Sequence, residues 1–208
     1  GLKRVNINLP SINNETYRKI TRSKYTPNDI ISGIQEALEA GLYPIKVNMV
    51  ILRGVNDSEV EDMIEFAKNH KVILQLIELE PVGIDRKIYD KFHLDLKQIE
   101  NELRTKARKV IVRKDMQNRR KYLLPEGVEV EIVKPIEDGS FCAACTRMRV
   151  TADGKLKPCL MRNDNLVDIL SKMRRGASRD EIERLFVTAA RRREPYWKLR
   201  DTQLRCST

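Results

Sequence analysis

Residues 44–79 read PIKVNMVILRGVNDSEVEDMIEFAKNHKVILQLIEL. Two mostly apolar segments, 44–52 and 72–79, flank a segment in which apolar residues recur every three or four positions. Continuous apolar segments of this length are typical of strands buried on both faces, and the intervening period is typical of an amphipathic helix. Two such strands joined by a helix through short connections predict a right-handed parallel βαβ unit.

The chain before this unit continues the pattern. Residues 4–9 (RVNINL) alternate between polar and apolar, which predicts a strand with Asn6 and Asn8 on one face. Residues 13–24 indicate a short helix or an irregular loop. Thr26 and Pro27 then open a helix that closes near Gly41. Residues 1–108 are therefore expected to be an α/β domain of parallel strands and helices.

Two polar residues lie inside the apolar strands of this domain. Lys46 and Gln75 must find a partner or face a ligand, because an unpaired polar group is costly to bury. For Lys46, a structural salt bridge and a phosphate contact are equally good interpretations.

Between these strands, Ser58 is expected to cap the helix, with Glu61 near the capping-box position.

Residues 109–208 are expected to form a second domain, of which residues 109–160 are expected to lie apart from the parallel sheet and pack across its open side. Short strands are predicted at 110–113, 122–124 and 128–133, with a basic turn at 119–121. Helices are predicted within 85–108, at 163–175 with Asn165 as a cap, and at 178–193 with Ser178 as the cap, completed by Glu181.

The segment 141–159, FCAACTRMRVTADGKLKPC, carries cysteines in a C-x2-C-x13-C pattern: Cys142, Cys145 and Cys159. Alternating residues on both sides of Asp153-Gly154 predict a hairpin that returns the third cysteine to the first two. Thiolates at this spacing favour zinc or an iron–sulfur cluster, although a redox pair and a chance pattern are alternatives. Structural zinc takes four protein ligands, and Cys206 lies near a polar C-terminus without a partner motif.

Two arginines follow the first cysteine pair closely. Arg147 and Arg149 are interpreted either as ordinary surface charges or as donors to an anion or phosphate beside the thiolates.

Composition limits the function classes. The chain has 208 residues, 41% of them hydrophobic, and a formal net charge of +10, which suits a polyanionic ligand or nucleic acid but also ordinary solubility. Four clustered cysteines indicate reduced thiols in a cytoplasmic setting rather than a disulfide scaffold.

We expect no membrane span and no signal peptide. Because the chain opens on Gly1 in a strand-like segment, it is expected to be the later part of a longer protein.

The segment 138–160, DGSFCAACTRMRVTADGKLKPCL, resembles the C-terminal cluster segment of the GTP 3',8-cyclase family. These radical S-adenosylmethionine enzymes begin molybdenum cofactor (molybdopterin) biosynthesis. Weaker similarity runs through KVNMVILRGVND at 46–57 and KRVNINL at 3–9. The resemblance implies that residues 1–108 are part of a TIM-like (βα) barrel, followed by a β-rich and helical region that carries an iron–sulfur site.

The resemblance also implies roles for individual residues. Cys142, Cys145 and Cys159 would hold a second [4Fe-4S] cluster whose open iron faces the purine. The GTP-binding residues would be Lys46, Arg147 and Arg149. The strand of Asn8 would line the S-adenosylmethionine site, where the family usually has serine. Gln75 and Glu80 stand where bacterial members carry arginine and methionine.

In that family an N-terminal C-x3-C-x2-C motif holds the first [4Fe-4S] cluster, which cleaves S-adenosylmethionine. The 208 residues contain no such motif, so this chain alone is expected to be inactive as a radical generator. Many bacterial members also end in Gly-Gly, whereas this chain ends in Arg205-Cys206-Ser207-Thr208.

The competing hypothesis is a zinc-binding basic module that interacts with RNA. Aromatic residues make up only 5% of the chain, which disfavours a stacking surface for single strands, so no nucleic acid is expected. A regulatory or scaffold fragment is a third interpretation, and a homodimer is compatible with all of them.

Overall fold

The computed structural model describes residues 1–136 and 139–194. The chain divides into two compact units, Gly1–Pro135 and Ile136–Thr208. Each unit has its own buried apolar cluster, so each is described by itself.

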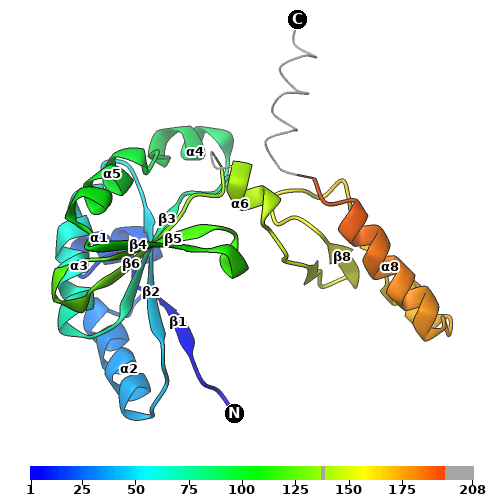
Figure 1. Ribbon diagram of the computed structural model, residues 1–208, viewed down its shortest axis with the longest axis horizontal. Helices are drawn as coiled ribbons and strands as arrows, with labels where there is room; N and C mark the ends of the chain where they lie inside the picture. The colour runs from blue at the N-terminus through cyan, green and yellow to red at the C-terminus, as the bar shows by residue number, and fades with distance from the viewer. Residues whose placement is uncertain (137–138, 195–208) are drawn as a thin grey trace, which may run out of the picture. The chain divides into compact units, whose positions relative to one another are not determined.

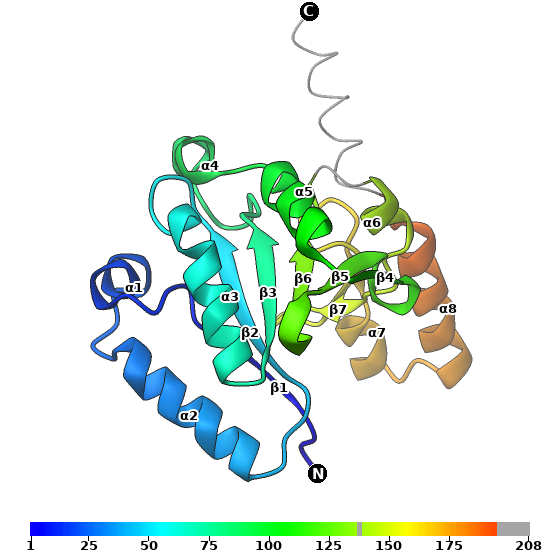
Figure 2. The same cartoon turned by 60° about the vertical axis from the view of Figure 1, so that its left-hand side comes forward.

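Unit 1 is built on a six-stranded sheet of order β1-β2-β3-β6-β5-β4 (Figures 1 and 2). Four neighbouring strands are parallel: β1 (Val5–Asn8), β2 (Ile45–Ile51), β3 (Ile73–Glu78) and β6 (Glu129–Val133). The last two, β5 (Arg119–Leu123) and β4 (Lys109–Arg113), run antiparallel. The predicted mixed α/β class with a parallel sheet is confirmed.

Five helices accompany this sheet in the described part of unit 1: α1 (Asn14–Thr21), α2 (Pro27–Glu39), α3 (Val60–Asn69), α4 (Arg86–Phe92) and α5 (Lys97–Lys106). Figures 1 and 2 show α2, α3 and α5 along the same face of the sheet. Fully or almost fully buried side chains from these helices and from the strands form one core: Ile34, Met63, Leu103, Val47, Leu76 and Ile132. The βαβ unit predicted from residues 44–79 is therefore present.

The helix starts test the predicted caps. The Asp29 carboxylate accepts hydrogen bonds from the Thr26 backbone nitrogen at 2.7 Å and from its hydroxyl at 2.8 Å, so the predicted start of α2 is confirmed. The prediction of Ser58 as a cap is wrong. A 3-10 turn, Asp57–Glu59, precedes α3, and Glu59 is its N-cap residue. Just after β2, the side-chain oxygen of Asn56 instead accepts a hydrogen bond from the Leu52 backbone nitrogen at 2.8 Å.

The expectation that residues 109–160 lie apart from the parallel sheet is wrong for β4, β5 and β6. Strand β6 pairs in parallel with β3, and residues 119–121, predicted as a basic turn, belong to β5. Basic residues can occupy this strand because nearby carboxylates pair with their charges. For example, Lys121 Nζ lies 2.5 Å from Glu129 Oε2. The compact units consequently divide after Pro135, whereas the sequence predicts a boundary after Arg108.

Unit 2 contains a three-stranded antiparallel sheet of order β7-β8-β9. Its described elements are α6 (Gly139–Ala143), β7 (Arg149–Val150), β8 (Lys155–Lys157), β9 (Val167–Asp168), α7 (Leu170–Arg174) and α8 (Arg179–Arg191). The core is small and consists of Leu156, Val167, Ile169 and Ala189, with Met148, Ile182 and Leu185 packed against it.

The predicted hairpin around Asp153-Gly154 is confirmed. Thr151 donates its backbone nitrogen to the Lys155 carbonyl at 2.9 Å, and Gly154 has a φ of +74°. A Cβ atom at Gly154 would lie 2.3 Å from the Cβ atom of Leu170, so both the conformation and the packing require glycine here.

The single helix predicted at 163–175 is wrong. This segment holds β9 and the short α7, and Asn165 is buried with its amide donating to the Arg192 carbonyl at 3.1 Å. The predicted start of α8 is confirmed, because Glu181 accepts from the Ser178 nitrogen at 2.8 Å. Trp197 and Cys206 lie outside the described residues. None of the helices in the described ranges is both long and apolar enough to cross a bilayer.

Candidate functional site

One face of the unit 1 sheet carries a row of polar side chains. Residues aligned across five strands are Asn8 on β1, Asn48 on β2, Gln75 on β3, Glu131 on β6 and Lys121 on β5. Successive strand residues point to opposite faces, and the neighbours of these residues in sequence belong to the core on the helix side. The row therefore lies on the face away from the helices.

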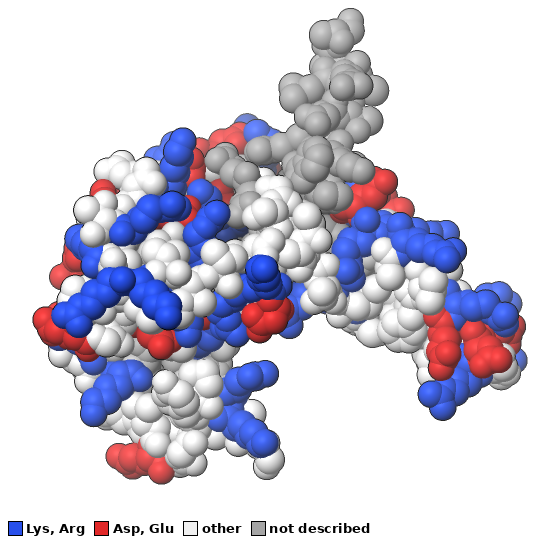
Figure 3. All heavy atoms as spheres, in the orientation of Figure 1, with Lys and Arg blue, Asp and Glu red and all other residues white. Residues whose placement is uncertain are grey.

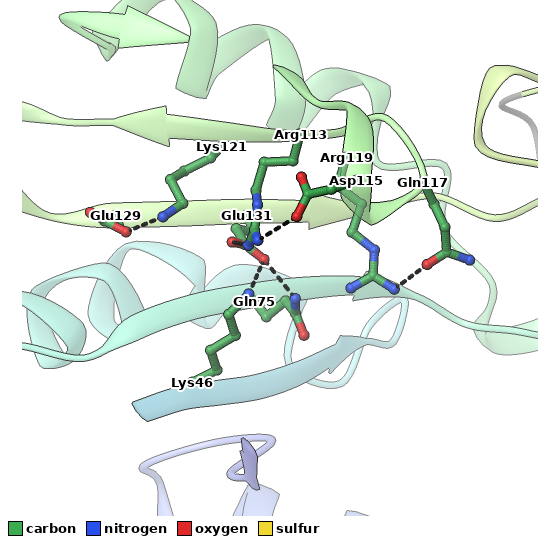
Figure 4. Close-up of polar contacts among 9 residues, drawn as sticks. All are labelled: Lys46, Gln75, Arg113, Asp115, Gln117, Arg119, Lys121, Glu129 and Glu131. Atoms are coloured by element: carbon green, nitrogen blue, oxygen red, sulfur yellow. Dashed lines mark hydrogen bonds and ion pairs between the residues drawn. The ribbon is translucent and has the colours of Figure 1, made fainter. Parts of the chain in front are cut away.

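Glu131 is the centre of this row. Its side chain is fully buried, and its Oε2 accepts from Lys46 Nζ at 2.6 Å and from Gln75 Nε2 at 2.8 Å. Its Oε1 accepts from Arg113 Nη1 at 3.0 Å (Figure 4). One carboxylate therefore binds side chains from β2, β3 and β4. We call Lys46, Gln75, Arg113 and Glu131 the buried charge cluster.

The cluster shifts the pKa values of its members. Burial raises the pKa of Glu131, but the hydrogen bond and charge of Lys46, with Gln75 and Arg113, outweigh it and hold the pKa below its ordinary value. Burial lowers the pKa of Lys46, and the attraction of Glu131 offsets only part of that change. The charges of Arg113 and Lys121 also lower the pKa of Lys46.

Two members of the cluster, Glu131 and Arg113, were missed from the sequence. Lys46, a predicted GTP-binding residue, makes the ion pair that the sequence left as one of two interpretations, and its contact with GTP stays a prediction. Glu131 has a sequence signal, because it is the second of the two acidic residues in the alternating strand VEVEIV (128–133). Arg113 has none, because its role depends on β4 and β6 belonging to one sheet.

Asn8, the predicted S-adenosylmethionine contact, is exposed at the end of β1. Its neighbour in register, Asn48, has a buried Oδ1 atom without a hydrogen-bond partner in the described part of the chain. An unpaired buried acceptor is rare and indicates a donor from a ligand or water. Asn48 was also missed, although the alternation of residues 44–52 places it on the face of Lys46.

The predicted cysteine ligands all lie in unit 2. Cys142 is in α6, and Cys145 follows in a turn where its backbone nitrogen donates to the Cys142 carbonyl at 3.1 Å. Cys159 follows the end of β8 by two residues. All three are thiols rather than disulfides, and all are partly exposed.

The three thiols have the right chemistry for a soft metal centre, because thiolates are the preferred ligands of zinc and iron–sulfur clusters. Within residues 1–136 and 139–194, however, no three His, Cys, Asp or Glu side chains stand together as a metal-binding group. The structure places the three cysteines in one unit, and both the ligand set and the shared cluster stay predictions.

The two predicted anion-binding arginines flank the start of the hairpin. Arg149 is the first residue of β7 and pairs with Lys157 across the sheet, and Arg147 is exposed in the preceding loop. On the face drawn in Figure 3, Lys and Arg side chains spread over both units with fewer Asp and Glu among them. This wide distribution fits the net charge of +10 and does not single out one basic groove.

Comparisons with known proteins cover nearly the whole chain. Residues 72–199 match the family model described as Molybdenum Cofactor Synthesis C, and residues 1–67 match the Radical SAM superfamily. The first match contains all three predicted cysteine ligands and both arginines.

Curated relatives agree with these matches. Proteins named probable GTP 3',8-cyclase are 48% identical over 95% of this chain in Methanothermobacter thermautotrophicus and 49% identical over 95% in Methanosarcina acetivorans. A protein of the same name in Thermococcus kodakarensis is 44% identical. The matched region is 64%, 57% and 65% of these relatives, so the chain spans less than two thirds of their length.

Proposed function

Because the chain belongs to the Molybdenum Cofactor Synthesis C family and begins with a Radical SAM superfamily segment, we propose that it is part of a GTP 3',8-cyclase. The complete enzyme would convert GTP to (8S)-3',8-cyclo-7,8-dihydroguanosine 5'-triphosphate in molybdenum cofactor biosynthesis. The observation that carries the proposal is the family match over residues 72–199, which includes the cysteine and arginine positions.

In this proposal unit 2 supplies the second [4Fe-4S] site through Cys142, Cys145 and Cys159. When bound, such a cluster would leave one iron without a protein ligand and thereby offer the purine a coordination site. The first cluster and S-adenosylmethionine would belong to the complete protein, whose remaining strands would complete a TIM-like barrel with the parallel sheet of unit 1. We also propose a cytoplasmic setting, because the thiols must stay reduced.

The proposed GTP-binding residues are Lys46 in unit 1 and Arg147 and Arg149 in unit 2. Charge-assisted hydrogen bonds from arginine and lysine are the strong contacts of phosphate groups. The role of Glu131 would be to hold the Lys46 ammonium, which lies 2.6 Å away, in one orientation. Asn8 and the unpaired Oδ1 of Asn48 mark the row proposed to face S-adenosylmethionine.

Anaerobic reconstitution with iron and sulfide tests the metal assignment. We expect a brown protein whose iron content falls sharply in Cys159→Ala and stays unchanged in Cys206→Ala. A colourless protein that holds zinc tightly would instead support the RNA-binding alternative. Equal iron contents in the wild type and Cys159→Ala would remove Cys159 from the ligand set.

A further inference from the structure

The chain just after helix α8 contacts the turn that carries Cys145. Arg193 donates from Nη1 to the Cys145 carbonyl at 2.6 Å and from Nη2 to the Arg147 carbonyl at 2.7 Å. One guanidinium therefore spans the loop on both sides of Thr146. Arginine is suited to this role, because its donors form a planar, rigid fork.

The same stretch of chain also contacts the segment that follows Cys159. Arg192 donates to the Leu166 carbonyl at 3.1 Å, and the buried Asn165 amide donates back to the Arg192 carbonyl at 3.1 Å. Glu194 accepts from Arg162, which is only 8% exposed, at 3.4 Å. Residues 192–194 thus contact both the Cys145–Arg147 turn and the segment 162–166, which begins three residues after Cys159.

We propose that residues 192–194 act as a clasp that holds the Cys145–Arg147 turn and the segment after Cys159 in place, with Arg193 as the positioning residue. The metal to be held rests on the proposed function, whereas the clasp itself is a contact within unit 2. Arginines near a helix C-terminus often interact only with the dipole of their own helix. Arg193 differs, because its guanidinium donates to carbonyls 46 and 48 residues away.

The clasp explains how three thiols without a preformed metal group can serve one centre. Fixing the backbone of the Cys145–Arg147 turn lowers the conformational entropy that metal binding must overcome. Removing Arg193 should therefore loosen the loop and weaken metal retention without removing a ligand.

The test compares Arg193→Ala and Arg193→Lys with Arg191→Ala in the 208-residue chain. Arg191 is the matched control, because it is exposed in the last turn of the same helix. Two quantities are measured: iron retained per chain after anaerobic reconstitution and desalting, and the alkylation rate of each cysteine in the metal-free chain, resolved by mass spectrometry.

We expect Arg193→Ala to lose at least half of its iron and to alkylate Cys142 and Cys145 about tenfold faster than the wild type, as the loss of two charged hydrogen bonds allows. Arg193→Lys should give intermediate iron content and intermediate alkylation rates, because an ammonium keeps the positive charge but cannot donate to both carbonyls with the planar geometry of a guanidinium. Arg191→Ala should match the wild type in both measurements.

The outcomes separate the clasp from the proposed function. A wild type that binds no iron would contradict the proposed function, and the alkylation rates would then decide the clasp alone. Equal iron contents and equal alkylation rates in Arg193→Ala and Arg191→Ala would overturn the clasp. Thermal unfolding of each variant shows whether it is folded. If Arg193→Ala does not fold, Arg193→Lys is compared with Arg191→Ala in its place.

Discussion

Glu131 is a fully buried carboxylate bound by three side chains, and its energetics differ from those of a surface ion pair. Removing one partner of a buried pair leaves the other charge without compensation in a medium of low polarity. For this reason the stability of unit 1 is expected to be sensitive to the loss of any charged member of the buried charge cluster.

We predict that Glu131→Gln lowers the free energy of unfolding by about 3–5 kcal/mol, because Lys46 and Arg113 lose their shared counter-charge. Glu129→Gln is the matched control on the same strand and face. Its ion pair with Lys121 is more exposed, with 30% of the Glu129 side chain accessible, and surface pairs contribute about 0–1 kcal/mol. Urea unfolding at neutral pH measures both, and equal losses would contradict the assigned importance of Glu131.

The same carboxylate predicts a pH dependence. The folded-state pKa of Glu131 is held below its ordinary value of 4.5, so its stabilising contribution is complete above that value and is lost as the pH falls through the folded-state pKa. Wild-type stability should therefore decline in acid more steeply than that of Glu131→Gln. Urea midpoints between pH 7 and pH 3 provide the measurement, and parallel curves would exclude this source of acid sensitivity.

Arg149 carries the residue-scale prediction for ligand binding. We expect Arg149→Ala to weaken GTP binding to the reconstituted chain by about 1.5–3 kcal/mol, the range for a hydrogen bond to a charged group. Arg174→Ala, on the exposed last turn of α7, is the control that removes equal charge from unit 2. Isothermal titration calorimetry distinguishes them, and equal affinities would place Arg149 outside the GTP site.

At the scale of elements, the two serines expected to cap helices provide a direct comparison. Ser178 caps α8 and exchanges hydrogen bonds with Glu181, whereas Ser58 lies in a 3-10 turn before α3. We predict that Ser178→Ala costs about 1 kcal/mol and that Ser58→Ala costs almost nothing. Thermal unfolding of both variants measures the difference, and similar losses would mean that Ser58 has a capping role after all.

Local sequence patterns predicted helices and strands well where apolar residues recurred with the same spacing throughout a segment. The apolar segments 44–52 and 72–79 became β2 and β3, and the Asp153-Gly154 turn formed its hairpin. The failures came where distant contacts decide the structure. Residues 119–121 look like a turn in isolation, but the carboxylates of neighbouring elements accept their charges and allow a strand.

The candidate site was predictable to a similar extent. Spacing singled out Cys142, Cys145 and Cys159, and the polarity of Lys46 inside an apolar strand marked it as a residue in need of a partner. The partner itself, Glu131, and the clasp residue Arg193 could not be paired with their targets from the sequence. Each contact joins residues more than 45 positions apart, and only the sheet order and the course of α8 bring them together.

At the scale of the whole molecule, the two units differ in how much apolar surface they bury. Unit 1 has an extended core between sheet and helices, whereas the core cluster in the described part of unit 2 contains four buried apolar residues. A small core supplies little stability on its own, and metal binding then contributes directly to folding. Unit 2 should therefore respond to metal more strongly than unit 1.

We predict that loading with iron and sulfide slows amide hydrogen exchange in β7, β8 and α8 and leaves β2 and β3 unchanged. Mass spectrometry of peptides from the loaded and metal-free chains measures this contrast, with Cys159→Ala as the control that should show no slowing. Uniform slowing in both units, or none in either, would contradict the assignment of the metal to unit 2.

The alignment of Lys46, Gln75 and Glu131 across three strands also bears on how the sheet assembles correctly. A slip of one residue in β6 would turn the Glu131 carboxylate into the hydrocarbon layer beneath the helices and leave the lysine ammonium alone on the opposite side. A shifted strand register would thus leave buried charges unpaired, whereas the native register pairs the charges of Lys46 and Glu131. The buried ion pairs therefore favour one alignment of these strands over its shifted alternatives.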